Sequence, residues 1–430
     1  MIINIKNVKM VQPSQEMPKR RLWLSNVDII ISRAHVPSIY FYRPTRSTSF
    51  FDPNVLKKAL SQALIPYYPV AGRLSRDFDG RRMEIDCNGE GVLFMEAETT
   101  STLDDFDDFA PTMEYKKLVP GVNCPGDISS SPLLLLQVTY FKCGGVSLGV
   151  AMHHVFADGF SRIQFINTWA EMSRGLEPTT SPFFDRLLLR ARDPPHYKSH
   201  PIEFQPSPKL LTPCPTNAPN STRTFKVTRE QINALKDKSK EDGDTTDYTS
   251  FEILSGHIWR CVCMARGLSD IQKVKLHIPV DARSRIQPNL PPSYFGNPTF
   301  YASPMTTAGD LVSKPASYAS NMIHESIIGM NDEYFRSAID FVELNLEKDI
   351  FGRSSLSRGC PNLVISSWSK LPVYDADFGW GRPIFMGPGW VNEDGYCYLV
   401  PRATNDGGLS VFITLMANHM DLFETYFSRI

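Results

Sequence analysis

The chain has 430 residues, of which 42% are hydrophobic and 21% are charged, as in an ordinary globular protein. The formal net charge of −1 argues against a nucleic-acid partner, which would require a strongly basic surface. The sequence has no apolar run near the roughly 18 residues that a membrane span needs, and its length exceeds one average core, so we expect two domains.

The N-terminal residues 1–6 lack the apolar core of a signal peptide and are expected to form the first strand, which favours a cytoplasmic protein. The eight cysteines are sparse and irregularly spaced, as buried free thiols in a reducing compartment would be. Cys261 and Cys263 lie two residues apart on a predicted helix and therefore point to different faces. We expect no metal site.

Helix signals begin at Asp52 and Pro53, where a carboxylate can cap the first turn and the missing N–H of proline costs nothing. An i, i+4, i+8 stripe of leucines follows and ends at Pro66. Strands are expected within residues 68–98 and, as a buried apolar run, over residues 132–141.

The next predicted strand, over residues 146–152, alternates strictly between large apolar residues on one face and small residues on the other. The small face consists of Ser147, Gly149 and Ala151. Such a face leaves room for something to lie close against it.

The motif H-x-x-x-D-G, from His154 to Gly159, follows this strand and leads into a helix predicted over residues 160–174. A rigid scaffold commonly presents reactive groups at such a place. With an ordinary pKa of about 6.5, His154 could accept a proton from a hydroxyl or amine at neutral pH. The alternative is a pair of histidines that cap the helix and are satisfied by a neighbouring carboxylate, and this short motif alone does not decide between the two.

Residues 194–219 contain eight prolines and little periodicity, which predicts an extended crossover between two halves. Ser250 is expected to cap a helix that runs to Arg266 and stops at Gly267. Strands and helices are mixed without a regular β-α-β rhythm, so we predict an α+β fold with mixed sheets. The expected parts are an N-terminal domain over residues 1–193, a crossover over 194–222 and a C-terminal domain over 223–430.

Two further motifs are Y-F-G-N at residues 294–297 and D-F-G-W-G at residues 377–381, the second within the expected C-terminal domain. Together with H-H-V-F-A-D-G and the proline-rich crossover, they resemble the plant BAHD acyl-CoA-dependent acyltransferases over the whole length. Segments such as FYRPT, YYPVAGRL and LPVYDADFGWGRPIFMGPG are similar to those of the hydroxycinnamoyl-CoA:shikimate/quinate hydroxycinnamoyltransferases. Rosmarinate synthase and the anthranilate acyltransferases belong to the same close group.

The resemblance implies two similar-sized domains with mixed β-sheets flanked by helices, as in chloramphenicol acetyltransferase, and a solvent channel between the domains. A coumaroyl or caffeoyl thioester of coenzyme A would be the co-substrate, with no tightly bound cofactor. The acceptor would be a polyol acid, shikimate or quinate. A hydroxyphenyllactate or an aromatic amine is the alternative acceptor, and we expect the enzyme to be a monomer.

In such an enzyme His154 would deprotonate the acceptor hydroxyl, which attacks the thioester carbonyl directly without a covalent enzyme intermediate. Asp158 would point away from the channel and pair with Arg283, so that a charge-assisted hydrogen bond holds the loop that orients His154. Trp368 matches an indole N–H donor to the tetrahedral oxyanion. Without the resemblance, Trp368 would be interpreted as a half-buried aromatic residue.

The D-F-G-W-G motif lies away from the chemistry in the family, so Asp377, Gly379 and Gly381 are expected to fix a loop rather than react. Coenzyme A needs donors for its phosphates, and the candidates are Ser250 and Arg285. The alternative interpretations of these two residues are a solvated helix cap and a surface arginine.

Five residues match positions that hold the hydroxyls and carboxylate of the acceptor, with Arg353 as the clamp for the carboxylate. Arg358 is an alternative clamp, because the residues between Arg353 and Cys360 depart from the usual sequence of the family. Phe156 replaces a usual small residue and would narrow the channel near the base. The matched acceptor residues are His35, Ser38, Tyr40, Arg353 and Ser366.

Two classes of function compete with acyl transfer. A hydrolase with a Ser/His/Asp triad is the alternative enzyme, and it is disfavoured because we expect the chain to lack a G-x-S-x-G nucleophile elbow. A binding protein for coenzyme A or phenolic compounds without activity is disfavoured by the presence of His154, Asp158 and Trp368.

Overall fold

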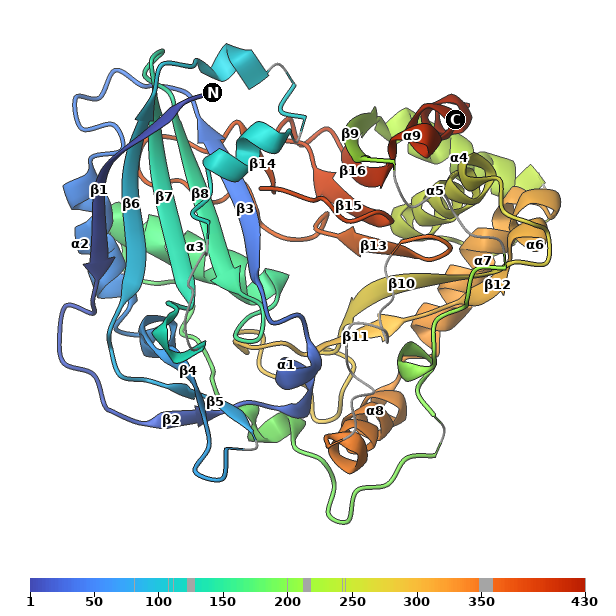
Figure 1. The fold of residues 1–430 in the computed structure, drawn as a ribbon, viewed down its shortest axis with the longest axis horizontal. Helices are drawn as coiled ribbons and strands as arrows, with labels where there is room; N and C mark the ends of the chain where they lie inside the picture. Colours follow the sequence, from blue (N-terminus) through green and yellow to red (C-terminus); the bar gives the residue numbers. More distant parts are fainter. Residues whose placement is uncertain are drawn as a thin grey trace. The chain divides into compact units, whose positions relative to one another are not determined.

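The computed structural model places the chain in two compact units, each built around a sheet of its own (Figure 1). The first unit consists of Met1–Arg190, Pro291–Pro298 and Leu371–Trp390, and the second of Ala191–Leu290, Thr299–Lys370 and Val391–Ile430. The structure describes residues 1–80, 82–106, 108–110, 112–121, 128–198, 200–211, 218–241, 243, 245–347 and 359–429.

The first unit is discontinuous in sequence, whereas the expected domains were continuous stretches over residues 1–193 and 223–430. The reason is strand pairing over a long separation, since β14 (Phe385–Pro388) pairs with β3 (His35–Tyr42). Such a pairing has no local signature in the sequence. The D-F-G-W-G motif therefore belongs to the first unit and not to the second.

The large sheet of the first unit is mixed, with the strand order β1-β6-β7-β8-β3-β14. In the described sheet β6 and β7 are parallel, and the other neighbours in this order are antiparallel. A small antiparallel sheet has the order β2-β5-β4. The bounds not yet given are β1 (Ile3–Val11), β2 (Arg21–Trp23), β4 (Arg73–Arg76), β5 (Met83–Asp86), β6 (Val92–Thr99), β7 (Leu134–Phe141) and β8 (Val146–His153).

Two helices cover one face of the large sheet, α2 (Pro53–Ala63) and α3 (Gly159–Ser173) (Figure 1). As predicted, α2 begins with Asp52, whose side chain accepts from the amide of Asn54. Trp169 of α3 ties the layers together, because its Nε1 donates to the carbonyl of Leu56 at 3.0 Å and its ring packs on a phenylalanine of β6. The shorter helical segments are α1 (Asn26–Ile30), η1 (Tyr68–Ala71), η2 (Leu103–Phe106), η3 (Met113–Lys117), η4 (Ile128–Ser130) and η5 (Arg186–Leu189).

The small-residue face of β8 is covered by the protein's own chain. A Cβ on Gly149 would lie 2.0 Å from the carbonyl oxygen of Leu118, so only glycine allows this close approach. Val119 then packs against Leu135 and Ala151 in a small apolar cluster. The close contact that the alternation indicated is therefore internal packing.

The second unit contains a mixed sheet in the order β11-β10-β13-β15-β16-β9, with β12 also paired to β10. The pairs of β10 with β13 and of β13 with β15 are parallel. Its strands are β9 (Asn220–Val227), β10 (Lys273–Asp281), β11 (Thr299–Ala302), β12 (Met305–Thr307), β13 (Leu363–Ser367), β15 (Tyr396–Pro401) and β16 (Leu409–Met416). Its helices are η6 (Ile202–Phe204), α4 (Arg229–Glu241), α5 (Ser250–Arg266), α6 (Ala308–Ser313), α7 (Ala316–Ile328), α8 (Asp332–Asn345) and α9 (Ala417–Phe427). The predicted α+β class with mixed sheets is confirmed.

The N-cap of helix α5 lies one residue earlier in the chain than the sequence suggested. Thr249 is the N-cap and forms a capping box with Glu252, while Ser250 is the first helical residue. At the other end Gly267 adopts the left-handed conformation, as expected for the residue that stops this helix. The side chain of Ser250 is therefore not used for capping.

The proline-rich crossover is anchored to the second unit. Glu203 is buried there and accepts from the amide of Tyr301 at 2.9 Å and from the hydroxyl of Tyr334 at 3.2 Å. Lys275 donates to the carbonyl of Ile202 at 2.8 Å. Residues 212–217, which complete the crossover, lie outside the described residues.

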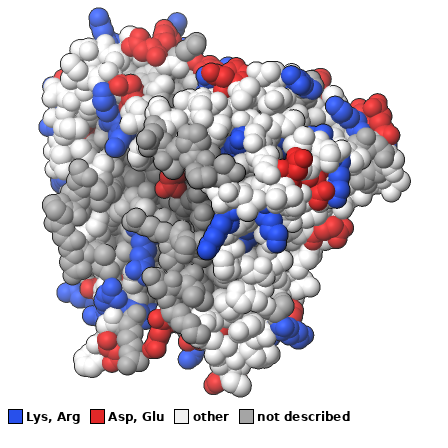
Figure 2. All heavy atoms as spheres, turned by 45° about the vertical axis from the view of Figure 1, so that its right-hand side comes forward, with Lys and Arg blue, Asp and Glu red and all other residues white. Residues whose placement is uncertain are grey.

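The surface carries charges of both signs. On the face drawn in Figure 2, lysine and arginine side chains are interspersed with aspartate and glutamate side chains. This distribution agrees with the net charge of −1. Within the described residues, no helix is long and apolar enough to cross a membrane.

Candidate active site

His154 follows directly after β8, in a turn that leads to α3. Its amide donates to the carbonyl of Ala34 at 2.9 Å, and the amide of Phe156 donates to the carbonyl of His153 at 3.1 Å. His154 as a whole is half-buried, but its Nδ1 is buried. The turn is thus tied to the sheet at the position of the histidine.

Asn297, the last residue of the Y-F-G-N motif, holds this turn from the other side. Its Nδ2 donates to the carbonyls of His154 at 2.9 Å and Val155 at 3.1 Å. Asn297 is itself held by Asp28, whose Oδ1 accepts from the backbone amide of Asn297 at 3.0 Å and from its Nδ2 at 2.9 Å. All of these residues belong to the first unit.

Asp28 forms a buried ion pair with Arg186. Its Oδ2 lies 3.1 Å from Nε of Arg186, and the two side chains are 0% and 1% exposed. Oδ2 also accepts from the amide of Ser25 at 2.9 Å and from its hydroxyl at 2.7 Å, as part of the capping box of α1. Arg186 donates in addition to the carbonyl of Phe156 at 2.9 Å. Each carbonyl from His154 to Phe156 therefore has a buried side-chain donor.

Sequence reasoning did not assign these three supporting residues. The sequence indicated Asn297 only as part of the Y-F-G-N motif, although asparagine side chains are common partners of backbone groups. Ser25 and Asp28 form the S-x-x-D pattern of a capping box, which could have indicated that the carboxylate is used locally. For Arg186 the sequence offers no such signal.

The side chain of Phe156 does not narrow the space at His154, contrary to the expectation. It is fully buried, with its ring 5.1 Å from that of Phe295 and the guanidinium of Arg186 5.6 Å from its centre. A benzyl group gains more free energy from this apolar packing than it would at a wet surface. Phe156 therefore contributes to the core behind the turn.

Asp158 is the N-cap of α3. Its Oδ1 accepts from the amide of Ser161 at 2.8 Å, and its own amide donates to the carbonyl of Gly296 at 3.1 Å. Arg283 lies in the second unit, where its Nη1 is 3.1 Å from Oδ1 of Asp281. The pairing of Asp158 with Arg283 stays a prediction.

The electrostatic surroundings keep His154 neutral. Burial and, to a smaller extent, the nearby charge of Arg162 lower the pKa of His154 to about 4, while its own backbone, Asp158 and Asn297 act in the opposite direction. Burial likewise lowers the pKa of the neighbouring His153 to about 3. The expected ordinary value of about 6.5 for His154 is therefore too high for this site. The site presents an unprotonated imidazole at neutral pH.

The acceptor residues on β3 lie on two faces of this strand. Ser38 and Tyr40 share one face, where the hydroxyl of Tyr40 is buried without a partner among the described residues. Burial raises the pKa of Tyr40, partly offset by the charge of Arg162 on α3. His35 lies on the other face, where its Nε2 is 2.8 Å from the carbonyl oxygen of Pro132.

The remaining acceptor candidates are not all described. Arg353 and Arg358 lie outside the described residues. Ser366, on β13 in the second unit, is opposite Tyr398 of β15. Trp368 follows the same strand, with its ring buried 5.2 Å from that of Tyr398 and its amide donating to Leu399 at 2.7 Å.

The D-F-G-W-G segment forms a tight turn in the first unit. Oδ1 of Asp377 accepts from the amide of Gly379 at 2.8 Å and from that of Gly381 at 2.9 Å. Both glycines have φ near +100°, a conformation that residues with a side chain rarely adopt. Asp377 therefore holds the turn with both of its glycines.

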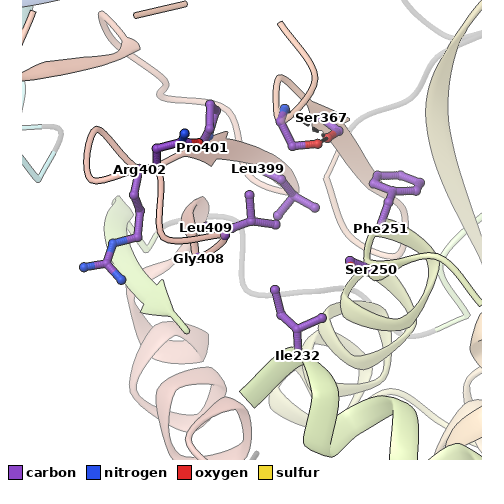
Figure 3. A pocket seen from close by; sticks show the side chains of 12 residues that line it. Ile232, Ser250, Phe251, Ser367, Leu399, Pro401, Arg402, Gly408 and Leu409 are labelled. Atoms are coloured by element: carbon purple, nitrogen blue, oxygen red, sulfur yellow. Dashed lines mark hydrogen bonds between the residues drawn. The ribbon is translucent and has the colours of Figure 1, made fainter. Parts of the chain in front are cut away.

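A cavity of about 230 Å³ lies within the second unit, between the N-terminus of α5 and the strands β13, β15 and β16 (Figure 3). Ser250 lines it from α5, and Ser367 and Ser369 line it from β13 and the residues after it. Arg285 is not among the residues that line it. Its Nη1 donates to the carbonyl of Ile327 at 2.7 Å, at the end of α7.

A Ser-based hydrolase site is not formed by the residues that match its motif. G-V-S-L-G at residues 145–149 fits the G-x-S-x-G pattern, so the expectation that the chain lacks this motif was wrong. Ser147 lies in the middle of β8 and is fully buried. A nucleophile elbow requires a serine exposed on a strand-to-helix turn, so this match is not one.

Within the described part of the chain, no cluster of three or more metal-ligating side chains occurs. Cys87, Cys143, Cys261, Cys263 and Cys397 form no disulfide. Burial raises the pKa of Cys261 and Cys263 to about 12, so both are inert thiols, whereas Cys143 is exposed.

Comparison with known proteins gives matches over the full length. The Transferase family matches residues 1–430. Shikimate O-hydroxycinnamoyltransferase of Nicotiana tabacum is 54% identical over 433 residues, covering 99% of this chain and 99% of its own. A hydroxycinnamoyltransferase of Narcissus pseudonarcissus is 49% identical over 436 residues, covering 99% of each chain. A hydroxycinnamoyl-CoA:5-hydroxyanthranilate N-hydroxycinnamoyltransferase of Avena sativa is 46% identical over 441 residues, covering 99% of each chain.

Solved structures with low sequence identity share the fold. Vinorine synthase has a TM-score of 0.76 at 22% identity, covering 98% of this chain and 96% of its own. TRI101 of F. sporotrichioides, complexed with coenzyme A and T-2, has a TM-score of 0.76 at 17% identity, covering 94% and 97%. Fold and family together define an acyl-CoA-dependent acyltransferase. The chain belongs to the Transferase family, that of the BAHD acyltransferases.

Proposed function

We propose that this acyltransferase transfers a hydroxycinnamoyl group from coenzyme A to a hydroxyl of shikimate or quinate, with His154 as the general base. The observation that carries the proposal is the position of His154, a neutral imidazole at the end of β8 in a turn whose backbone is fixed on both sides. The similarity to the tobacco enzyme, whose name specifies shikimate, supports this acceptor.

In the proposed reaction, His154 takes the proton of the acceptor hydroxyl as its oxygen attacks the thioester carbonyl. The tetrahedral intermediate then expels the thiolate of coenzyme A, and the proton on the imidazole neutralises that thiolate. The indole N–H of Trp368 donates a hydrogen bond to the oxyanion. Loss of such a donor typically lowers kcat by about 10²–10³-fold. Asp158 acts through structure, by holding the turn and pairing with Arg283.

We assign Ser250 to coenzyme A because its side chain lines the cavity of the second unit and is not used as a helix cap. The amides of the first turn of α5 add partial positive charge beside it, which favours a phosphate group. Arg285 is the weaker of the two candidates, since its Nη1 is already bonded to α7.

For the acceptor, an arginine fork provides bidentate recognition of a carboxylate, and Arg353 or Arg358 is proposed for this role. Ser38, Tyr40, His35 and Ser366 are proposed as contacts for the hydroxyls. The buried hydroxyl of Tyr40, which lacks a partner among the described residues, has the capacity for a further hydrogen bond.

A second acceptor class is an aromatic amine. The similarity to the Avena sativa enzyme, which is named for transfer to 5-hydroxyanthranilate, favours this candidate. The chemistry at His154 is the same for both classes, because the base removes a proton from the attacking oxygen or nitrogen.

The test is to incubate the protein with coumaroyl-CoA and shikimate, quinate, hydroxyphenyllactate or 5-hydroxyanthranilate, and to identify the products by mass spectrometry. We expect an ester of shikimate or quinate as the main product. Replacement of His154 by alanine should lower kcat by about 10²–10⁴-fold, the usual contribution of a general base. The neighbouring variant His153→Gln is the matched control and should retain most of the turnover.

Either of two results would overturn the proposal. If His154→Ala turns over within a few-fold of the wild type while His153→Gln is inactive, the base is misassigned. An amide of 5-hydroxyanthranilate as the dominant product would replace the polyol acid by the second acceptor class.

A further inference from the structure

We propose that Asn297 is a positioning residue for His154: its Oδ1 accepts a hydrogen bond from Nδ1–H of the imidazole, so that Nε2 keeps the lone pair that takes the substrate proton. This inference rests on the proposed role of His154 as the base. It assigns to the asparagine of Y-F-G-N a function beyond holding the backbone of the turn.

The first argument is a pair of complementary buried atoms. Among the described residues, Nδ1 of His154 and Oδ1 of Asn297 are both buried and both lack a hydrogen-bond partner. A neutral imidazole has one nitrogen that donates and one that accepts, whereas an amide oxygen only accepts. Leaving both atoms unsatisfied carries a desolvation penalty for each, and one hydrogen bond between them removes both penalties.

The second argument is the orientation of the amide, which is fixed by its other end. Nδ2 of Asn297 faces three oxygens, those of the Asp28 carboxylate and of the His154 and Val155 carbonyls. Exchanging Oδ1 and Nδ2 would place an acceptor against all three. The amide oxygen is therefore the atom available to the imidazole.

The third argument is electrostatic. The side chain of Asn297, after the backbone of His154 itself and Asp158, acts to raise the pKa of His154, against the larger lowering by burial. A contact that raises the pKa of the imidazole favours the imidazolium, which forms when the base takes its proton. A neutral amide does this without the strong rise in pKa that a carboxylate partner would cause.

The Asn297 side chain also links the backbone of His154 to the ion pair of Asp28 and Arg186. Asp28 and Arg186 are buried, and both oxygens of Asp28 are engaged by Ser25, Arg186 and Asn297. The other charged or titratable groups that act on His154 are Arg162 and Asp158 of α3, and His153 of β8 lies beside it. Asn297 offers the imidazole an acceptor, its Oδ1, that is buried and unused in the described structure.

The direct test is the tautomer of His154 in the unliganded wild-type protein. Histidine labelled with ¹⁵N in the ring, with the His154 signals assigned by their loss in His154→Gln, distinguishes a protonated from an unprotonated ring nitrogen by NMR. We expect Nδ1 to be protonated and Nε2 to be unprotonated at pH 7. A protonated Nε2 would overturn the inference, and this measurement needs no variant of Asn297 that folds.

The second measurement is the kinetics of Asn297→Ala. We expect kcat to fall at least about tenfold with little change in the KM of coumaroyl-CoA, because a misoriented base affects proton transfer and not thioester binding. The tautomer signal of His154 should at the same time become a mixture. A pure Nδ1–H tautomer in this variant would contradict a positioning role, whatever happens to its stability.

Ser161→Ala is the matched control, because the Ser161 hydroxyl exchanges hydrogen bonds with the backbone of Gly296, in the same segment as Asn297. It should lower the melting temperature while kcat and the tautomer remain those of the wild type. The two proposals fail separately. An active His154→Ala defeats the base, whereas an inactive His154→Ala together with a protonated Nε2 defeats only the role of Asn297.

Discussion

The imidazole of His154 is neutral because it is buried beside a positive charge. Burial and Arg162 together lower its pKa to about 4, so almost none of the enzyme carries a protonated base at pH 7. A low pKa also weakens the driving force for removing a proton from a hydroxyl. The hydrogen bond that we propose from Nδ1 of His154 to Oδ1 of Asn297 acts in the opposite direction and offsets part of this lowering.

This pKa leads to a prediction for the pH profile. A lowered folded-state pKa means that His154 becomes protonated only as the pH falls towards about 4. We therefore expect kcat/KM, which reports on the free enzyme, to stay nearly constant from about pH 8 down to about pH 5.5. Initial rates with coumaroyl-CoA and shikimate at constant ionic strength measure this profile. A half-loss of kcat/KM near pH 6.5 that recovers on return to pH 7 would show that the imidazole has its ordinary pKa.

At the scale of the element, helix α3 depends on Asp158 as its N-cap. Replacing Asp158 by alanine should cost about 1 kcal/mol of stability for the lost cap alone. Asp158→Asn separates the two roles, because asparagine caps as well as aspartate but carries no charge. If the carboxylate pairs with Arg283 as predicted, the asparagine variant should also lose thermal stability and activity.

Thermal unfolding and kcat of both variants measure this difference. An asparagine variant with an unchanged melting temperature but lost activity would indicate a direct chemical role for Asp158. An asparagine variant that keeps both its melting temperature and its activity would show that only the helix cap matters.

The short helix α1 contributes a second anchor, the buried pair of Asp28 and Arg186. Replacing Arg186 by methionine leaves the Asp28 carboxylate buried without its cation, which typically costs about 3–5 kcal/mol. We expect a large decrease in the free energy of unfolding, measured by chemical denaturation. The double variant with Asp28→Asn should recover part of the loss, because no buried charge then remains.

An exposed pair serves as the control. Nζ of Lys6 lies 2.5 Å from Oε1 of Glu98 on the surface, and about half of each side chain is exposed. Lys6→Met should leave the denaturation curve unchanged, since solvent screens such pairs. A comparably small effect of Arg186→Met would contradict the anchoring role of the buried pair.

Local signals in the sequence predicted structural features well where those features depend only on residues that are neighbours in the chain. Asp52 and Pro53 begin α2 as expected, and Gly267 ends α5. The N-cap of α5 was assigned to Ser250 instead of Thr249, because two adjacent hydroxyl residues give the same signal. Errors of this kind are confined to a residue or two.

At the scale of the whole molecule, the sequence alone indicated the fold class and the position of the candidate base. It did not indicate that Asn297, Asp28 and Arg186 support this base. Asn297, for example, lies 143 positions from His154 and 269 positions from Asp28 in the sequence. Buried polar networks join residues according to the folded chain, and no periodicity records them. The assignment of residues 371–390 to the first unit was missed for the same reason.

The discontinuity of the first unit has a consequence for the order in which the protein is made. During synthesis, the ribosome delivers residues 1–190 first, but the edge strand β14 and the asparagine that holds the His154 turn come only after residues 297 and 388 have emerged. Until then β3 is an unprotected strand edge, which is open to pairing with other chains. A nascent N-terminal half therefore lacks its edge strand until most of the chain has been translated, which leaves it prone to aggregation during that time.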